Sequence, residues 1–189
     1  MTSQSRKSRP RPPGTSLRDD MHAMIRVDHA GEYGAIRIYE GQLAVLGRDA
    51  RAAASVAAIR HMAAQEHAHF AIFDRLLNER DVRPTALEPV WHVAGYALGA
   101  VTALLGEKAA MACTAAVEEV IDEHYAGQAE RLGESDPELK AIIEHARAEE
   151  LAHREQAIEA GAEDAPAYPL LSAMIKFGCR TAIALAERI

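Results

Sequence analysis

The chain contains the segment Gln65-Glu66-His67-Ala68-His69 and, 84 residues later, a close copy of it, Glu149-Glu150-Leu151-Ala152-His153. Around these segments, seven of the thirteen positions in 57–69 are identical to their counterparts in 141–153, where composition alone would give about one or two. Such a repeat indicates that one structural unit occurs more than once in the fold. Each copy contains Glu-x-x-His, a spacing that places both side chains on one face of a helix.

A second repeat lies upstream of each copy. With a shift of 86 residues, Glu32, Tyr39, Gly41, Gln42, Leu46 and Gly47 match Glu118, Tyr125, Gly127, Gln128, Leu132 and Gly133. The sequence therefore predicts two copies of one hairpin. Each hairpin would consist of a helix with one inward Glu, a turn, and a helix with Glu-x-x-His.

The composition favours a helical protein with a single folded domain. Of the 189 residues, 49% are hydrophobic and only 5% aromatic, and this length suffices for one domain with its own core. We expect a disordered tail over residues 1–16, which are polar, basic and rich in proline, and one domain over 17–189. A net charge of −7 argues against nucleic acid as a partner. Cys113 and Cys179 have no CxxC spacing and are expected to be reduced core residues.

Helix geometry predicts that the repeated Glu and His side chains meet in one layer. Glu32 and Glu66 lie at similar distances, roughly 24 Å, from the turn near Arg48. Glu118 and Glu150 satisfy the same condition around the turn at 133–137. If the two hairpins pack with pseudo-twofold symmetry, six inward side chains converge: Glu32, Glu66, His69, Glu118, Glu150 and His153.

This set of side chains is the pattern of carboxylate-bridged di-iron or di-manganese sites in ferritin-like four-helix bundles. Four carboxylates balance two divalent cations, and oxygen ligands with one imidazole per metal suit iron or manganese better than structural zinc. We expect Glu32 and His69 to be terminal ligands of one metal, and Glu118 and His153 of the other. Glu66 and Glu150 are expected to bridge both. A single Glu-x-x-His is common on helix surfaces, so the prediction depends on the duplication and the even spacing.

Several neighbours of these residues are expected to support them. Glu119 lies about 100° around the helix from Glu118 and is expected to be a solvated or supporting acid. Metal-bound imidazoles usually donate their second N–H to an acceptor, and Asp28 and Asp122 are the expected acceptors. Tyr39 and Tyr125 fit two roles equally well: residues that support the site, or core residues whose hydroxyl groups have a hydrogen-bond partner elsewhere.

Each half of the chain ends in an apolar segment, residues 90–105 and residues 170–185. A bilayer-spanning helix needs about 20 apolar residues, so both segments are expected to be interfacial or buried helices. They would either reach a lipid surface or complete a core or a dimer interface. The predicted fold is therefore all-α, a ferritin-like four-helix bundle with two additional hydrophobic helical segments.

Several strings of residues resemble the demethoxyubiquinone hydroxylase family of ubiquinone biosynthesis, and the likeness extends over about 25–189. The strings are Arg26-Val27-Asp28-His29-Ala30-Gly31-Glu32-Tyr33-Gly34-Ala35, Tyr39-Glu40-Gly41-Gln42, Arg83-Pro84-Thr85, residues 100–105, Met111-Ala112-Cys113-Thr114, Val117-Glu118-Glu119, His124-Tyr125, Glu149-Glu150-Leu151-Ala152-His153 and Ala165-Pro166-Ala167-Tyr168. The resemblance implies a monooxygenase that hydroxylates ring position 6 of demethoxyubiquinol or demethoxyubiquinone. It also implies two iron ions, O₂ as co-substrate, and NADH or another reductant. His124 and Tyr125 would act as catalytic relay residues.

The resemblance also sets expectations for partners and location. A prenylated quinone or quinol dissolves in the bilayer, so the segments 90–105 and 170–185 are expected to contact the membrane surface. A lipid-presenting partner protein, a complex of ubiquinone-biosynthesis enzymes and a homo-oligomer stay open. With no signal or transit peptide recognised, the expected location is peripheral, on the cytoplasmic face of the cell membrane.

Three other functions fit parts of the same pattern. A ferritin-like iron-storage protein would form a soluble cage with polar outer helices. A lipid-binding structural protein would pair its carboxylates with Arg and Lys. A different di-metal oxidase, such as a manganese catalase or a fatty-acyl oxidase, would keep the metals and change the substrate.

Overall fold

The computed structural model of the protein describes residues 16–189, and the expected disordered tail lies outside this range except for Ser16. Within this range the chain forms helices and no strand, which confirms the all-α prediction. The helices are α1 (Leu17–Leu46), η1 (Ala50–Ala52), α2 (Ala53–Glu79), α3 (Glu88–Leu104), α4 (Glu107–Leu132), α5 (Pro137–Glu159), η2 (Ala162–Asp164) and α6 (Tyr168–Ala186).

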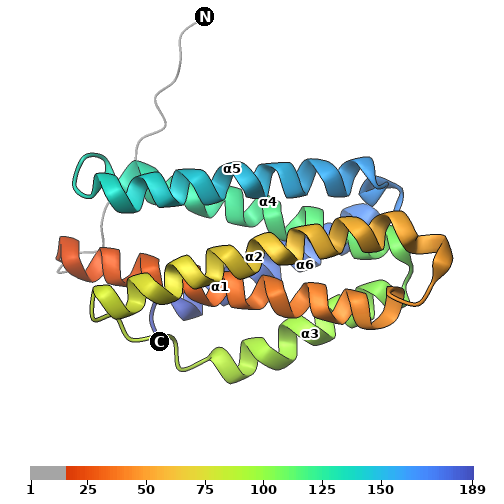
Figure 1. Ribbon diagram of the computed structural model, residues 1–189, viewed down its shortest axis with the longest axis horizontal. Helices are drawn as coiled ribbons and strands as arrows, with labels where there is room; N and C mark the ends of the chain where they lie inside the picture. The colour runs from red at the N-terminus through yellow and green to blue at the C-terminus, as the bar shows by residue number, and fades with distance from the viewer. Residues whose placement is uncertain (1–15) are drawn as a thin grey trace, which may run out of the picture.

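The four longest helices form a bundle of two antiparallel hairpins, α1 with α2 and α4 with α5 (Figure 1). Local signals define where these helices begin. Ser16 and Asp19 form a capping box at the start of α1, which satisfies free backbone N–H groups at the helix end. Asp136 accepts a hydrogen bond from the Leu139 amide, and Pro137 stands at the first position of α5, where its missing N–H costs no helical hydrogen bond.

The two additional apolar segments form α3 and α6, and both repeat the same arrangement. Each follows a hairpin and folds back along the first helix of that hairpin, α3 along α1 and α6 along α4 (Figure 1). The duplicated unit is therefore a set of three helices. Two hairpins with two appended hydrophobic helices are the architecture that the sequence predicts.

The appended helices are attached in different ways. A Cβ added at Gly99 of α3 would lie 1.9 Å from the Ile38 carbonyl oxygen, whereas one added at Gly178 of α6 would have no atom within 4 Å. Glycine thus allows the backbones of α3 and α1 to touch. The α6 helix is instead connected to α4 through side chains, including the ion pair between Lys176 and Glu119 at 2.6 Å.

Two large apolar clusters fill the bundle. One includes Tyr39, Ile59, Met62 and Met111, and the other includes Ile25, Phe73, Tyr125 and Leu139. The positions of these residues along their helices place the clusters on opposite sides of the predicted Glu and His layer. Cys113 is buried, as expected of a core residue, whereas Cys179 is only half-buried, and both are free thiols.

Candidate metal centre

The structure brings together all six residues of the predicted layer, and each is at most 4% exposed. Their donor atoms form two overlapping groups, within each of which all atoms lie within 4.8 Å of one another. One group contains Glu32, Glu66, His69 and Glu150, and the other contains Glu66, Glu118, Glu150 and His153. Glu66 and Glu150 belong to both groups, which is the arrangement that bridging carboxylates need.

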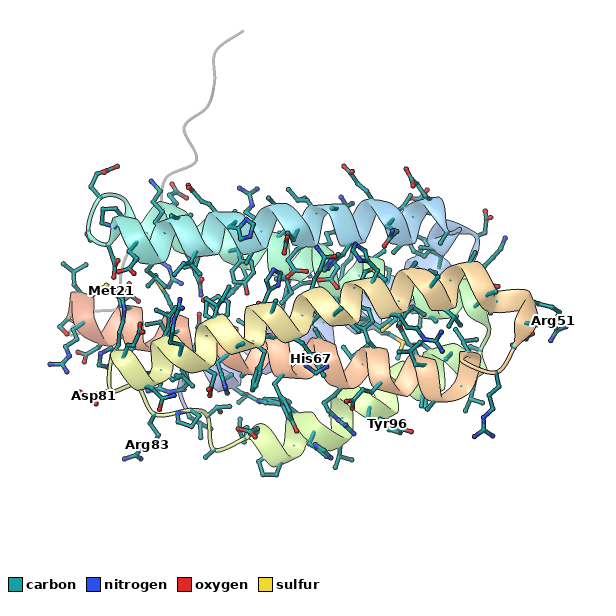
Figure 2. The ribbon with its side chains drawn as sticks, viewed as in Figure 1. Met21, Arg51, His67, Asp81, Arg83 and Tyr96 are labelled. Atoms are coloured by element: carbon teal, nitrogen blue, oxygen red, sulfur yellow. The ribbon has the colours of Figure 1, made fainter. Side chains whose placement is uncertain are left out.

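Both imidazoles point the same nitrogen at the shared carboxylates. His69 Nδ1 lies 3.3 Å from Glu150 Oε1 and 3.5 Å from Glu32 Oε2. His153 Nδ1 lies 3.1 Å from Glu66 Oε1 and 3.1 Å from Glu150 Oε2. By contrast, His67, between Glu66 and His69 in the chain, is exposed on the outer surface of α2 (Figure 2).

The charges of the layer are consistent with bound cations. Burial, and then the nearby carboxylate of Glu150, raise the pKa values of Glu66 and Glu118 well above their usual range. Burial also acts to raise the pKa of Glu150, but its contacts with the imidazoles of His153 and His69 outweigh burial and lower that pKa to about 2. Glu66 Oε1 and His69 Nδ1 are buried and face other polar atoms of the layer without making a well-aligned hydrogen bond. Two divalent cations would neutralise four carboxylates and bind these two atoms, so these residues fit a two-metal site.

The outer nitrogen of each imidazole contacts the opposite half of the protein. His69 Nε2 lies 2.5 Å from Glu149 Oε2, and His153 Nε2 lies 3.1 Å from Gln65 Oε1. Sequence reasoning missed both partners. Gln65 and Glu149 are equivalent polar residues that directly precede the shared carboxylates, and this repetition was the signal that could have identified them.

The two aspartates expected in this role have other partners. Asp122 Oδ1 accepts a hydrogen bond from Arg147 Nε at 2.6 Å, because it lies on the side of α4 that faces Arg147 of α5. Asp28 Oδ1 accepts a hydrogen bond from Gln128 Nε2 at 2.7 Å and lies 3.4 Å from His124 Nε2. Asp28 and Asp122 each lie one helical turn from a glutamate of the layer, but neither contacts the imidazole of His69 or His153.

Each of the two repeated tyrosines contacts a glutamate of the layer that belongs to the other half of the chain. Tyr39 donates a hydrogen bond to Glu118 Oε1 at 2.8 Å, and Tyr125 donates one to Glu32 Oε1. Burial, followed by the nearby carboxylates, raises the pKa values of both phenols well above their usual range. Both therefore remain protonated donors, and their hydroxyl groups are satisfied at the site rather than elsewhere in the core.

Glu119 does not contact the layer. Its carboxylate pairs with Lys176 Nζ at 2.6 Å and with Arg154 at 3.4 Å, so it links α4 to α6 and α5. The six residues of the layer instead contact one another and the Tyr, Gln and Glu partners described above. This arrangement disfavours the structural-protein alternative, which requires Arg or Lys partners for these carboxylates.

A narrow gap connects the layer to a large apolar cavity. The gap has a volume of about 30 Å³ and is lined by Glu32, Glu66, Glu118 and Glu150, with Asp28, His124 and Tyr125. The cavity has a volume of about 760 Å³ and lies between α1, α3, α4 and α6. The two spaces share six lining residues, namely Val27, Gly31, Ala35, Val117, Ile121 and Ile183. The apolar cavity therefore adjoins the gap that borders the carboxylates.

A four-helix bundle with one Glu from each of two helices and Glu-x-x-His from each of the other two defines the class of ferritin-like di-metal carboxylate proteins. The family model described as "Ubiquinone biosynthesis protein COQ7" matches residues 19–186. The chain belongs to this family, which confirms the resemblance found in the sequence.

Curated relatives agree with this assignment. The chain is 58% identical over 165 residues to the 3-demethoxyubiquinol 3-hydroxylase of Rhodospirillum rubrum, covering 87% of this chain and 76% of the relative. It is 51% identical over 170 residues to the human mitochondrial NADPH-dependent 3-demethoxyubiquinone 3-hydroxylase, covering 88% and 76%. It is 41% identical over 181 residues to the mitochondrial 5-demethoxyubiquinone hydroxylase of Saccharomyces cerevisiae, covering 88% and 77%.

Proposed function

We propose that the protein hydroxylates the ring of demethoxyubiquinol or demethoxyubiquinone, at the position that later becomes O-methylated, with O₂ as co-substrate. The observation on which this proposal chiefly rests is the pair of ligand groups that share Glu66 and Glu150 and open through a gap onto an apolar cavity. The names of the relatives supply the substrate and the reaction. The six residues of the layer would hold the two iron ions in the roles predicted from the sequence.

The bound iron pair would supply the activation of O₂ for insertion of one oxygen atom into a ring C–H bond. The second oxygen atom leaves as water, which requires two electrons and two protons from a reductant. Reduced nicotinamide nucleotide is the proposed electron source, because the names of several relatives specify NADPH; the sequence resemblance had suggested NADH or another donor.

The apolar cavity is the proposed binding site for the prenyl tail. Its volume of about 760 Å³ falls within the range of about 300–1,000 Å³ that is typical of small-molecule sites. Side chains such as Leu98, Leu171 and Ile175 line it and would bury the tail through the hydrophobic effect. The ring would then lie at the gap, next to the carboxylate layer.

His124 and Tyr125 are proposed to manage protons at the gap, as the sequence resemblance implies. His124 lies beside Asp28, and Tyr125 donates a hydrogen bond to Glu32. Burial raises the pKa of Asp28 despite its contact with His124, which favours the protonated form of this carboxyl group more than solvent would. Asp28 and His124 are therefore the proposed proton-handling pair at the mouth of the gap.

The outer faces of α3 and α6 are the proposed contact with the membrane. Large apolar side chains on these helices are exposed, including Val93, Leu104, Leu170, Met174 and Phe177 at 64–74%. By length and composition alone, α6 is the one helix of the described part of the chain that could cross a membrane. Only 17% of its apolar stretch of 18 residues is buried inside the protein. Because Lys176 and Arg180 of α6 pair with glutamates of α4, we propose that α6 lies in the membrane surface. The cytoplasmic face of the cell membrane stays the predicted location, and partner proteins and a homo-oligomer stay predictions.

The proposed reaction can be tested with purified protein that is reconstituted with Fe(II). The protein would be incubated with a short-tailed demethoxyubiquinol, a reductant and ¹⁸O₂, and the quinone products separated and weighed by mass spectrometry. We expect a ring-hydroxylated product that contains one ¹⁸O atom. Folded, iron-loaded protein that yields no such product, or a product without ¹⁸O, would refute the proposed function.

A further inference from the structure

The outer partners of the two site imidazoles differ in charge. Glu149 offers a carboxylate oxygen to His69 Nε2 at 2.5 Å, whereas Gln65 offers an amide oxygen to His153 Nε2 at 3.1 Å. Glu149 and Gln65 are equivalent under the 84-residue shift of the repeat. The pseudo-twofold symmetry of the six ligand positions is therefore broken directly behind them.

This difference should affect how strongly each imidazole binds a cation. When Nδ1 binds a metal, the remaining ring proton is on Nε2 and is donated to the outer partner. A hydrogen bond to a carboxylate is roughly twice as strong as one between neutral groups, and it makes the ring a better donor to the metal. The side chain of Glu149 is 31% exposed, so solvent screens its charge only in part.

A second pair of equivalent positions differs in the same direction. Gln128 Nε2 donates to Asp28 Oδ1 at 2.7 Å, whereas its counterpart Gln42 Nε2 donates to the Ala110 carbonyl oxygen at 3.0 Å and to Thr114 Oγ1 at 3.3 Å. Asp28 and Thr114 are equivalent under the 86-residue shift. Asp28 lies one helical turn before Glu32, so the additional carboxyl group is again on the side of the Glu32 and His69 position.

We propose that the two metal positions are unequal, and that the position of Glu32 and His69 binds a divalent cation more tightly than the position of Glu118 and His153. Glu149 acts as a positioning residue through His69, and Gln65 is its weaker counterpart behind His153. This inference rests on the proposed two-metal site and assigns an order of occupancy to it.

The test is a calorimetric titration of the metal-free, full-length protein with Co(II) under argon. We expect wild-type protein to bind Co(II) in two steps, the first at least about tenfold tighter than the second. Glu149→Gln should weaken the first step about tenfold, in line with the 10–100-fold effect of outer partners of metal ligands. Gln65→Glu should strengthen the second step. The double variant Glu149→Gln/Gln65→Glu should again bind Co(II) in two separate steps.

The matched control is Glu155→Gln, which removes the same charge from an exposed position of α5 and should change neither step. Far-UV circular dichroism verifies that each variant is folded. A Glu149→Gln protein with both binding constants unchanged would overturn the inference, and so would Glu149→Gln and Gln65→Glu acting on the same step. No Co(II) binding by wild-type protein would overturn the two-metal site itself and, with it, this inference.

Discussion

The two halves of the molecule agree closely in the Glu and His layer and differ in how their third helix is attached. In the first half, glycines bring the backbones of α3 and α1 into contact, and Cβ atoms at Gly41 and Gly99 would lie 2.2 Å and 1.9 Å from carbonyl oxygens of the other helix. In the second half, α6 is connected to α4 by the ion pairs of Lys176 and Arg180. Both helices nevertheless form walls of the same cavity.

This difference separates two kinds of structural constraint. The proposed two-metal site requires the same side chains from both halves, so the duplicated Glu and His residues and the tyrosines behind them keep matching positions. A cavity wall requires only an apolar surface, so helix packing in the two halves could diverge. The α3 wall depends on glycine at particular positions, whereas the α6 wall depends on side chains that other residues can replace.

The largest expected effect concerns the part in which the halves agree. Glu66→Ala and Glu150→Ala each remove a shared carboxylate, so both should lower turnover by at least about a thousandfold, the scale of a lost catalytic group. Helicity should be largely retained, because a neutral residue replaces a carboxylate that is buried at a cost without its metals. Turnover measurements and far-UV circular dichroism would check both points, and near-wild-type activity in either variant would contradict the bridging roles.

The next effect tests the contrast between the third helices. Gly99→Ala should lower the free energy of unfolding by about 3 kcal/mol, because its Cβ would overlap the Ile38 carbonyl oxygen and force the backbones apart. Gly178→Ala is the matched control. It meets no atom within 4 Å and should stabilise α6 by up to about 1 kcal/mol through helix propensity. Urea denaturation measures both, and equal effects would show that the two attachments do not differ.

A pH effect should arise from the layer and not from the glycine contact, which contains no titrating group. Neighbouring carboxylates raise the pKa values of His69 and His153 despite burial, and burial raises those of Glu66 and Glu118. Groups with a raised folded-state pKa stabilise the fold at low pH and lose that contribution as the pH rises. The pKa of Glu150, lowered to about 2, affects stability only under strongly acidic conditions.

The metal-free protein should therefore melt at a lower temperature at about pH 8.5 than at about pH 5.5. The iron-loaded protein should show the opposite trend over this interval, because metal ligands must be deprotonated. Thermal melts of both forms, followed by circular dichroism under argon, would check this. A metal-free protein whose melting temperature rises with pH would disagree with the charge balance of the layer.

The smallest expected effect concerns the ion pairs of α6. Lys176→Met removes the charge that faces Glu119 and retains most of the apolar stem, so it should lower stability by only about 0.5 kcal/mol. Arg180→Met is a suitable comparison, because its partner Glu123 is more exposed than Glu119, and its effect should be smaller still. If Lys176→Met lowered the free energy of unfolding as much as Gly99→Ala, the predicted difference between the attachments of α6 and α3 would be contradicted.

The convergence of the Glu and His residues could be predicted from the sequence because the repeat aligned them. Their order, spacing and residue types predicted a bundle in which Glu32, Glu66, His69, Glu118, Glu150 and His153 meet, and the structure places them together. The appended helices could likewise be predicted as apolar segments. The helix on which each one packs depends on contacts between helices, which are backbone contacts at Gly41 and Gly99 for α3 and side-chain contacts for α6.

The outer hydrogen bonds could not be predicted from helix position alone. Asp28 and Asp122 lie one turn from Glu32 and Glu118, yet their partners in the structure are Gln128 and Arg147. The imidazoles of His69 and His153 contact residues of the opposite half of the chain. Such contacts depend on how two helices pack, which the residue spacing within one helix does not predict. The cavity also depends on how far α3 and α6 stand apart, which the sequence does not specify locally.

The central claim is that the layer holds a pair of metal ions through two shared carboxylates. The most direct test is elemental analysis combined with Mössbauer spectroscopy of protein that is reconstituted with ⁵⁷Fe(II) under argon, freed of excess iron and then oxidised. We predict about two iron ions per chain, one for each ligand group, with the diamagnetic ground state of a coupled diferric pair. A folded protein that retains no iron, or only isolated paramagnetic ferric ions, would contradict this account.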